Sequence, residues 1–263
     1  WQDLQAELKS LMAKAPAATT LHIDLAGRDP DDGMTDIAYE KGAAFLRSIE
    51  AAAGRERFDA YLRGYFDRHA FAPQTTAGFL RDLQEHLLAG DATLEPRIGT
   101  QGWAYAPGLP ATAVAPQSPR LAQLDDAAAA FAARGTAALG DVSGWNTAER
   151  VHVLQNLPRK LSPVRLAQLD EAMGLSRTGN SEVRFAWLRL AIANRHAPAV
   201  PQLEAFLTSM GRRKFVLPLF TDLMGQGEWG KALAQRIYAA ARPGYHTVTV
   251  GSVDKVVPLA PGG

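Results

Sequence analysis

The stretch "GWAYAPGLPATAVAPQSPR", residues 102–120, divides the sequence into two parts and decides its organisation. Four of its residues are proline. Proline is excluded from helix interiors and central strands, because its ring fixes φ and removes the backbone N–H donor. The neighbouring parts instead repeat apolar residues at the three- and four-residue spacing of amphipathic helices. The sequence therefore predicts a mostly α-helical chain with a first domain over 1–108, a proline-rich linker over 109–120 and a second domain over 121–263.

In the first part, an opening amphipathic stretch is followed by a turn-rich segment and three predicted helices. The turn-rich residues 19–36 can hold at most a short extended piece around 21–25. The helices are expected from Glu40 to a stop at Gly54, across 58–66, and from a cap at Thr75 or Thr76 through Leu87.

In the second part, short helices follow one another and predict an α-helical, solenoid-like domain, although the letters show no repeat. Cap and stop residues mark several boundaries, with Asn146 or Thr147 and the pair Ser162–Pro163 as starts and Pro158 as a stop. The last residues, 244–263, are expected to add an extended segment. The expected helices run over 121–138 and 146–157, from 162 onward, and over 180–194, 198–210 and 228–241.

The overall composition excludes several classes of function. The chain has 28 Lys plus Arg against 27 Asp plus Glu, a formal charge of +1, so we expect neither nucleic acid nor an acidic membrane surface as a partner. No apolar run approaches the roughly 20 residues of a membrane-spanning helix. Cysteine is absent, which excludes disulfides and thiolate sites but leaves the compartment open. The expectation is a soluble protein, either cytoplasmic or periplasmic and secreted.

The histidines do not form a metal-binding pattern. The nearest pair lies 17 residues apart, so two histidines cannot share one turn of a helix, and no H-E-x-x-H motif occurs. We therefore predict no metal ligands in this chain and interpret each histidine as a surface or hydrogen-bonded residue. The histidines are His22, His69, His86, His152, His196 and His246.

Three groups of polar residues stand at unusual positions. Tyr39 lies at the start of a predicted helix, where Ser, Thr, Asp or Asn would cap better. An acidic turn with Asp29, Asp31 and Asp32 precedes it, and "GRRKF" occupies 211–215. Such features are usually a packing residue, a simple turn and a solvated helix end, so the residues alone leave a functional site undecided.

Four blocks resemble one known family in letters and in order. They are "DPDDGMTDIAYEKG" at 29–42, "GWAYAPGLP" at 102–110, "NSEVRFAWLRL" at 180–190 and "GRRKFVLPLFTDL" at 211–223. Together they resemble M1-family zinc aminopeptidases of the leukotriene A4 hydrolase branch, and the similarity extends from Trp1 to about Lys255. The resemblance implies the last part of a thermolysin-like catalytic domain followed by an α-helical, armadillo- or HEAT-like domain.

The resemblance also implies roles for single residues. Tyr39 matches the family tyrosine that hydrogen-bonds the tetrahedral oxyanion when zinc-bound water attacks the scissile carbonyl. A neutral phenol suits this role, since it donates to developing negative charge without titrating at working pH. Arg212 and Lys214 match the basic pair that holds the carboxylate of a short peptide substrate, through forked hydrogen bonds and an ammonium charge.

Two positions bear on a second activity of that branch. Asp31 matches an aspartate that lines the same cleft and directs water in epoxide opening. Met34 stands where the leukotriene hydrolase has a tyrosine. The resemblance therefore favours aminopeptidase chemistry on short peptides over epoxide hydrolysis.

The family's zinc ligands, its general-base glutamate and its G-x-M-E-N loop match no part of the sequence. The resemblance thus implies a carboxyl-terminal portion of an enzyme whose intact parent binds zinc, with the upstream catalytic half as its partner, and no peptidase activity of this chain alone. The alternative is a non-enzymatic α-helical solenoid that binds a partner, which would not require Tyr39, Arg212 and Lys214 to converge.

Overall fold

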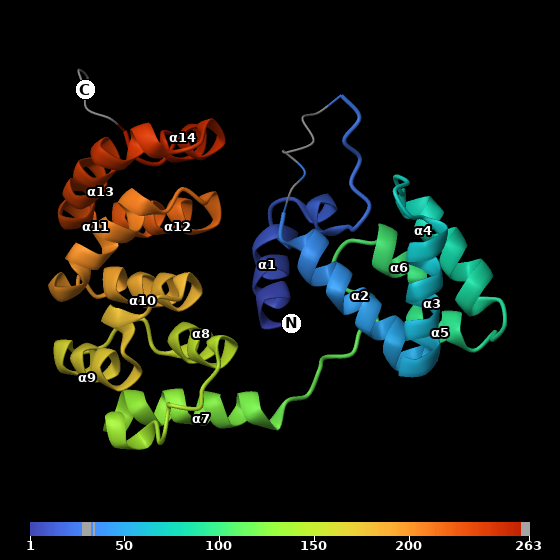
Figure 1. Ribbon diagram of the computed structural model, residues 1–263, viewed down its shortest axis with the longest axis horizontal. Coiled ribbons are helices and arrows are strands. Elements are labelled where there is room, and N and C mark those ends of the chain that lie inside the picture. The colour runs from blue at the N-terminus through green and yellow to red at the C-terminus, as the bar shows by residue number, and fades with distance from the viewer. Residues whose placement is uncertain (28–32, 34, 259–263) are drawn as a thin grey trace. The chain divides into compact units, whose positions relative to one another are not determined.

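The computed structural model describes residues 1–27, 33 and 35–258, and it forms two compact units, Trp1–Gln117 and Ser118–Gly263 (Figure 1). All regular elements in these described residues are helical, so the predicted mostly α fold is confirmed. The short extended piece around 21–25 is not a strand but irregular backbone. We refer to the two parts as the first and second units.

The first unit contains the predicted helices together with short ones that the pattern did not indicate. Gly54 ends α2 at φ +85°, and the Thr75 hydroxyl accepts from Gly78 N at 3.0 Å to cap α4, as predicted. The short helices α5 and α6 were not foreseen. The elements are α1 (Gln2–Met12), a 3-10 turn (Pro16–Thr19), α2 (Ile37–Ala53), α3 (Arg55–Arg68), α4 (Thr76–Leu83), a π-helical turn (Gln84–Leu88), α5 (Leu94–Ile98) and α6 (Thr100–Tyr105).

The core of the first unit is built around α2. Phe45 stacks on Trp103 of α6 with ring centres 5.6 Å apart, and its other neighbour is Phe79 of α4, at 6.2 Å. Ile37 and Ile49 of α2 are also buried. Because these side chains lie at four-residue spacing, they fix which face of α2 points inward and which residues of α2 remain outside.

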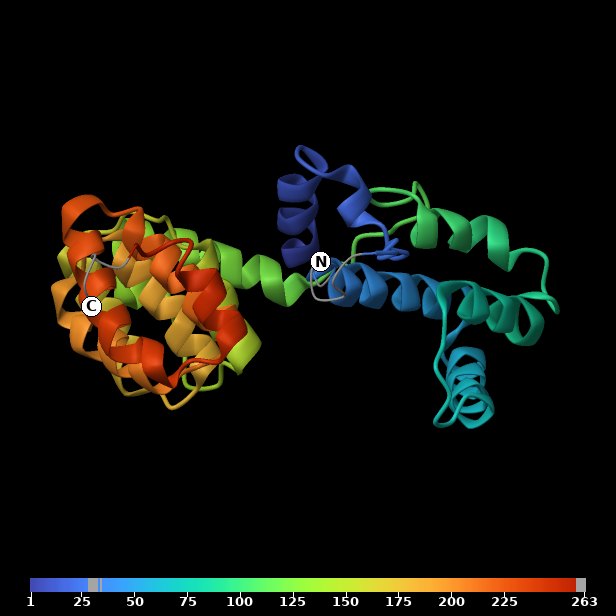
Figure 2. The ribbon, with the colours of Figure 1, turned by 90° about the horizontal axis from the view of Figure 1, so that it is seen from above.

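The second unit is a stack of helices in chain order (Figures 1 and 2). From α8 onward, every second helix packs on the next: α8 on α10, α10 on α12 and α12 on α14. Helix α13 packs on α11 and α12. This arrangement confirms the predicted solenoid-like domain. The elements are α7 (Pro119–Arg134), α8 (Thr147–Asn156), α9 (Pro163–Met173), α10 (Ser181–Ala193), α11 (Val200–Ser209), α12 (Arg213–Met224), α13 (Gly227–Ala241) and α14 (Thr247–Val253).

Capping residues begin several of these helices where the sequence predicts. Asn146 forms a capping box with Glu149 at the start of α8, and the Ser162 hydroxyl accepts from Arg165 N before α9. The Asn180 side chain accepts from the backbone of Glu182 and Val183 at the start of α10. These bonds satisfy amides that a helix start leaves without an internal partner.

The prediction of an extended tail is wrong, because residues 247–253 form α14. The His246 ring nitrogen accepts from Val248 N at 3.3 Å, and Thr249 and Val253 are buried. Packing of α14 against α12 decides the helical conformation of this segment.

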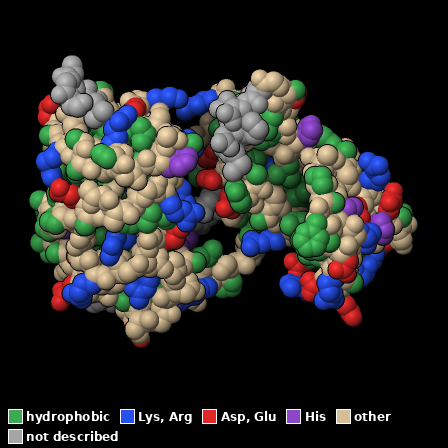
Figure 3. Space-filling view, turned by 45° about the horizontal axis from the view of Figure 1, so that its top comes forward, with side chains coloured by type: hydrophobic (Ala, Val, Ile, Leu, Met, Phe, Trp, Pro, Cys, Tyr) green, Lys and Arg blue, Asp and Glu red, His purple; other side chains and the backbone are tan. Residues whose placement is uncertain are grey.

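Two further observations concern the surface. No helix in the part of the chain that the structure describes is long and apolar enough to cross a membrane. Basic and acidic side chains are interspersed on the face that Figure 3 shows, in keeping with the near-zero formal charge.

Candidate functional site

Tyr39 is the third residue of α2 and its side chain is exposed, at 65 % of the accessible maximum. The helix begins after Asp36, whose side chain makes no capping hydrogen bond. Tyr39 therefore neither fills the core nor completes the helix start, which removes the two ordinary structural explanations for a tyrosine at this position.

Tyr39 stands at a groove of about 560 Å³ on the first unit, which we call the Tyr39 groove. Its walls are largely apolar, with Gly42 opening space on α2. The phenol of Tyr39 therefore stands beside an apolar surface while its side chain remains open to solvent. The lining residues are Leu21, Ala38, Tyr39, Gly42, Ala43, Phe45, Leu46, Thr75, Thr76, Phe79, Leu80 and Ala104.

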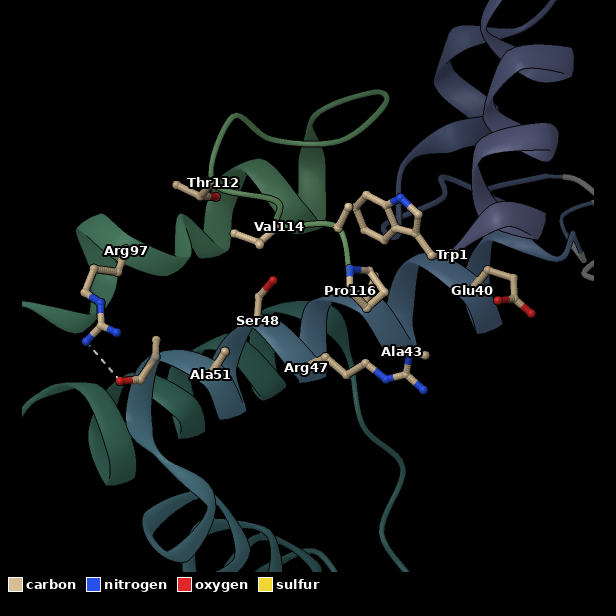
Figure 4. A pocket seen from close by; sticks show the side chains of 13 residues that line it. Trp1, Glu40, Ala43, Arg47, Ser48, Ala51, Arg97, Thr112, Val114 and Pro116 are labelled. Atoms are coloured by element: carbon tan, nitrogen blue, oxygen red, sulfur yellow. Dashed lines mark hydrogen bonds between the residues drawn. The ribbon is translucent and has the colours of Figure 1, made fainter. Parts of the chain in front are cut away.

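A second hollow, of about 600 Å³, runs along a neighbouring face of α2 (Figure 4). It is more polar, because Glu40 and Arg47 of α2 and Arg97 of α5 contribute to its walls. Arg97 points toward α2, where its Nη1 donates to the Ala52 carbonyl at 3.0 Å (Figure 4). Helix α2 therefore presents open surface on two adjoining sides.

Lys41, two residues after Tyr39, is fully buried. Its ammonium donates to the carbonyls of Thr19 and Ala106, at 2.9 and 2.8 Å. Desolvation by burial lowers the pKa of Lys41 from 10.5 to about 8. The Thr19 hydroxyl in turn accepts from Gly108 N at 2.9 Å, so Lys41 ties the start of α2 to two distant loops.

Sequence reasoning missed Lys41, although a signal was present. Ile37, Lys41, Phe45 and Ile49 share the four-residue spacing of the buried face of α2. A lysine in such a stripe must find acceptors or lose its charge. The buried ammonium therefore fixes the backbone that carries Tyr39.

In the second unit, Arg212 and Lys214 are brought together at the start of α12. Both cations lie near the ring of Phe215, with the Arg212 guanidinium carbon 5.9 Å and the Lys214 Nζ 4.9 Å from the ring centre. Phe215 is itself buried and held between the rings of Phe185 and Phe206, at 5.3 and 5.9 Å. The platform that gathers the two cations is therefore part of the rigid core.

The intervening Arg213 does not join them, since its Nε donates to the Ser252 hydroxyl of α14 at 2.9 Å. Lys214 also forms an ion pair with Glu182 of α10, Nζ to Oε1 at 2.6 Å. The sequence could not indicate this contact, because 32 residues separate its partners.

The remaining predicted site residues are placed as follows. Asp31 and Met34 lie outside the described residues. Tyr39 belongs to the first unit, whereas Arg212 and Lys214 belong to the second. A common cleft for the three residues stays a prediction.

The residues described do not fit a zinc site. In the ranges that the structure covers, no group of three His, Asp or Glu side chains could hold a metal ion. Asp82 is approached by His69 at 2.9 Å and by His86, but Arg68 already binds both of its carboxylate oxygens at 2.8 Å. This cluster around the buried Asp82 is a structural tie between α3 and α4, and the hydrogen bond from Arg68 is the main reason that the pKa of Asp82 is lowered.

Comparison with known families shows which class of protein the chain resembles. The family model "Peptidase family M1 domain" matches residues 3–95, and "Leukotriene A4 hydrolase, C-terminal" matches residues 145–257. The two matches occur in the order that the sequence blocks predict. Over these two regions the chain therefore resembles the M1 peptidases of the leukotriene A4 hydrolase branch.

Individual relatives agree. Rat aminopeptidase B is 28 % identical over 251 residues, 90 % of this chain and 38 % of the relative. Leucine aminopeptidase 2 of Ajellomyces capsulatus is 27 % identical over 256 residues, 90 % of this chain and 39 % of its own length. The chain thus spans less than half the length of these relatives.

Solved structures show the same fold. Yeast leukotriene A4 hydrolase in complex with bestatin superposes with a TM-score of 0.82 at 24 % identity. Native yeast leukotriene A4 hydrolase gives 0.78 at 25 % identity. In both comparisons, 98 % of this chain and 45 % of the hydrolase chain are covered.

Proposed function

We propose that this chain acts as the carboxyl-terminal portion of an M1-type zinc aminopeptidase that removes amino-terminal residues from short peptides. The observation that carries the proposal is the pair of cations, Arg212 and Lys214, gathered over Phe215 at the start of α12. The family match and the exposed position of Tyr39 on its groove support it.

The basic pair suits a peptide carboxylate. A guanidinium offers forked hydrogen bonds to two oxygens, and an ammonium adds a compact charge. Both stand at the amino end of α12, where the helix dipole also favours an anion. In the proposed function they anchor the far end of the substrate, and Asp31 and Met34 are further substrate-binding residues.

Tyr39 has a different task in this proposal. Its hydroxyl donates a hydrogen bond to the oxygen that becomes negative when the peptide carbonyl turns tetrahedral. Such a donor stabilises the transition state by about 3 to 4 kcal/mol. The buried contacts of Lys41 hold the helix that presents it.

The metal chemistry of the M1 family is assigned to the upstream catalytic half of the parent enzyme. No step by this chain alone then generates a nucleophile for Tyr39 to assist. We therefore expect no peptidase activity from the separate chain.

Reconstitution tests the proposal. The chain is mixed with a separately produced upstream M1 segment and zinc, and hydrolysis of an aminoacyl anilide is measured. We expect activity from the mixture and none from either piece. The proposal is contradicted if the two pieces form a stable complex that shows no activity. It is also contradicted if the upstream segment with zinc hydrolyses the anilide equally well without this chain.

A further inference from the structure

One of the two proposed carboxylate anchors already has an anionic partner. Lys214 Nζ lies 2.6 Å from Glu182 Oε1, and both side chains are about half exposed, at 53 % and 44 %. Glu182 is the second residue of α10, and its backbone amide is held by the Asn180 side chain at 3.0 Å. The competing carboxylate therefore stands at a defined position on a capped helix.

Arg212 differs from Lys214 in this respect. Among the residues that the structure describes, no carboxylate lies within ion-pair distance of Arg212, whose guanidinium is 5.9 Å from the Phe215 ring centre. The two anchors thus differ before any ligand binds. Glu182 neutralises the charge of Lys214, whereas no described carboxylate neutralises the charge of Arg212.

We propose that Glu182 is a specificity-determining residue that sets how strongly the chain captures a peptide carboxylate, by competing with it for the Lys214 ammonium. This inference rests on the proposed function of Lys214. An ammonium has three donors and can serve two carboxylates, but two like charges a few ångströms apart repel each other. An arriving carboxylate must therefore displace Glu182 or bind against its repulsion.

The competition has a selective consequence. It weakens only ligands that carry a free carboxylate, and it leaves ligands with a neutral carboxyl-terminal amide unaffected. Removing the charge of Glu182 while keeping its shape should strengthen carboxylate binding about 1.5- to 5-fold, the range of a partly exposed ion pair. Glu182→Gln makes this change.

The chain offers a matched control. Glu204 of α11 pairs with Arg236 of α13 at the same distance, 2.6 Å, and with similar exposure, 53 % for Arg236 and 38 % for Glu204. Glu204→Gln removes an equivalent ion pair from helices that do not carry the anchors. If Glu182→Gln and Glu204→Gln change ligand binding equally, the change comes from the loss of any surface ion pair and not from Glu182 in particular.

The experiment titrates the isotope-labelled chain with trialanine and with trialanine amide, followed by NMR chemical shifts up to millimolar ligand. The unmodified chain, Glu182→Gln, Glu204→Gln and Lys214→Met are compared, and thermal unfolding confirms that each variant folds. We expect Glu182→Gln alone to tighten trialanine binding about 1.5- to 5-fold, with no change for the amide.

Two results would overturn the inference, and they differ in their meaning. If Lys214→Met weakens trialanine binding while Glu182→Gln leaves it unchanged or weaker, Glu182 positions Lys214 rather than competing, and the anchor itself stands. If trialanine binds no better than its amide in any variant, the carboxylate anchors fail as well.

Discussion

At the scale of single residues, the proposed oxyanion donor Tyr39 has no structural role in the fold. Tyr39 is exposed and caps no helix, so its replacement by phenylalanine should leave stability nearly unchanged. In the reconstituted enzyme we expect Tyr39→Phe to lower kcat about 100- to 1,000-fold with little change in KM, because one oxyanion donor is lost. Steady-state kinetics on an aminoacyl anilide measure this, and a loss below about threefold would remove Tyr39 from the chemistry.

Lys41 predicts a pH effect of a definite sign. Burial lowers the pKa of Lys41 to about 8, whereas a lysine in the unfolded chain keeps its ordinary pKa of 10.5, so the unfolded state binds more protons between these values. The contribution of Lys41 to the free energy of unfolding should therefore rise with pH, by about 2 kcal/mol between pH 8 and pH 10. Denaturant unfolding of the unmodified chain and of Lys41→Met at several pH values checks this, since the variant should lack that rise. Parallel pH profiles would contradict it.

At the scale of elements, α12 and α13 approach so closely that only glycine fits at position 230. A Cβ on Gly230 would lie 1.9 Å from the backbone oxygen of Leu223, which cannot move without moving α12. We expect Gly230→Ala to destabilise the second unit by about 3 kcal/mol. Gly251→Ala in α14 is the matched control, because nothing lies within 4 Å of its Cβ, and alanine there should be neutral or slightly stabilising. Denaturant unfolding measures both variants. If they change the free energy of unfolding equally, the close approach of α12 and α13 at Gly230 is refuted.

The same scale shows what sequence patterns could predict. Helices that begin with a capping side chain, such as α8 after Asn146 and α9 after Ser162, were placed correctly, because the cap is a local interaction. Helix α12 was missed, since Pro218 in its interior removes a helical donor and argues against a helix. Burial of Phe215, Leu219 and Phe220 outweighs that cost.

The candidate site was predictable only in part. The likeness of four sequence blocks to a family assigned Tyr39, Arg212 and Lys214, which residue chemistry alone did not select. The contacts that surround them, between Lys41 and Thr19 and between Lys214 and Glu182, join residues far apart in sequence. Such contacts follow from packing, and no local pattern encodes them.

At the scale of the whole molecule, the central claim is that the two units serve one substrate, with oxyanion stabilisation from the first and carboxylate capture from the second. The most direct test is kcat/KM of the reconstituted enzyme on a tripeptide and on its carboxyl-terminal amide, with Arg212→Ala/Lys214→Met as the variant. The account predicts at least a tenfold loss for the free acid and almost none for the amide. Equal losses for both substrates, or no loss for either, would contradict it.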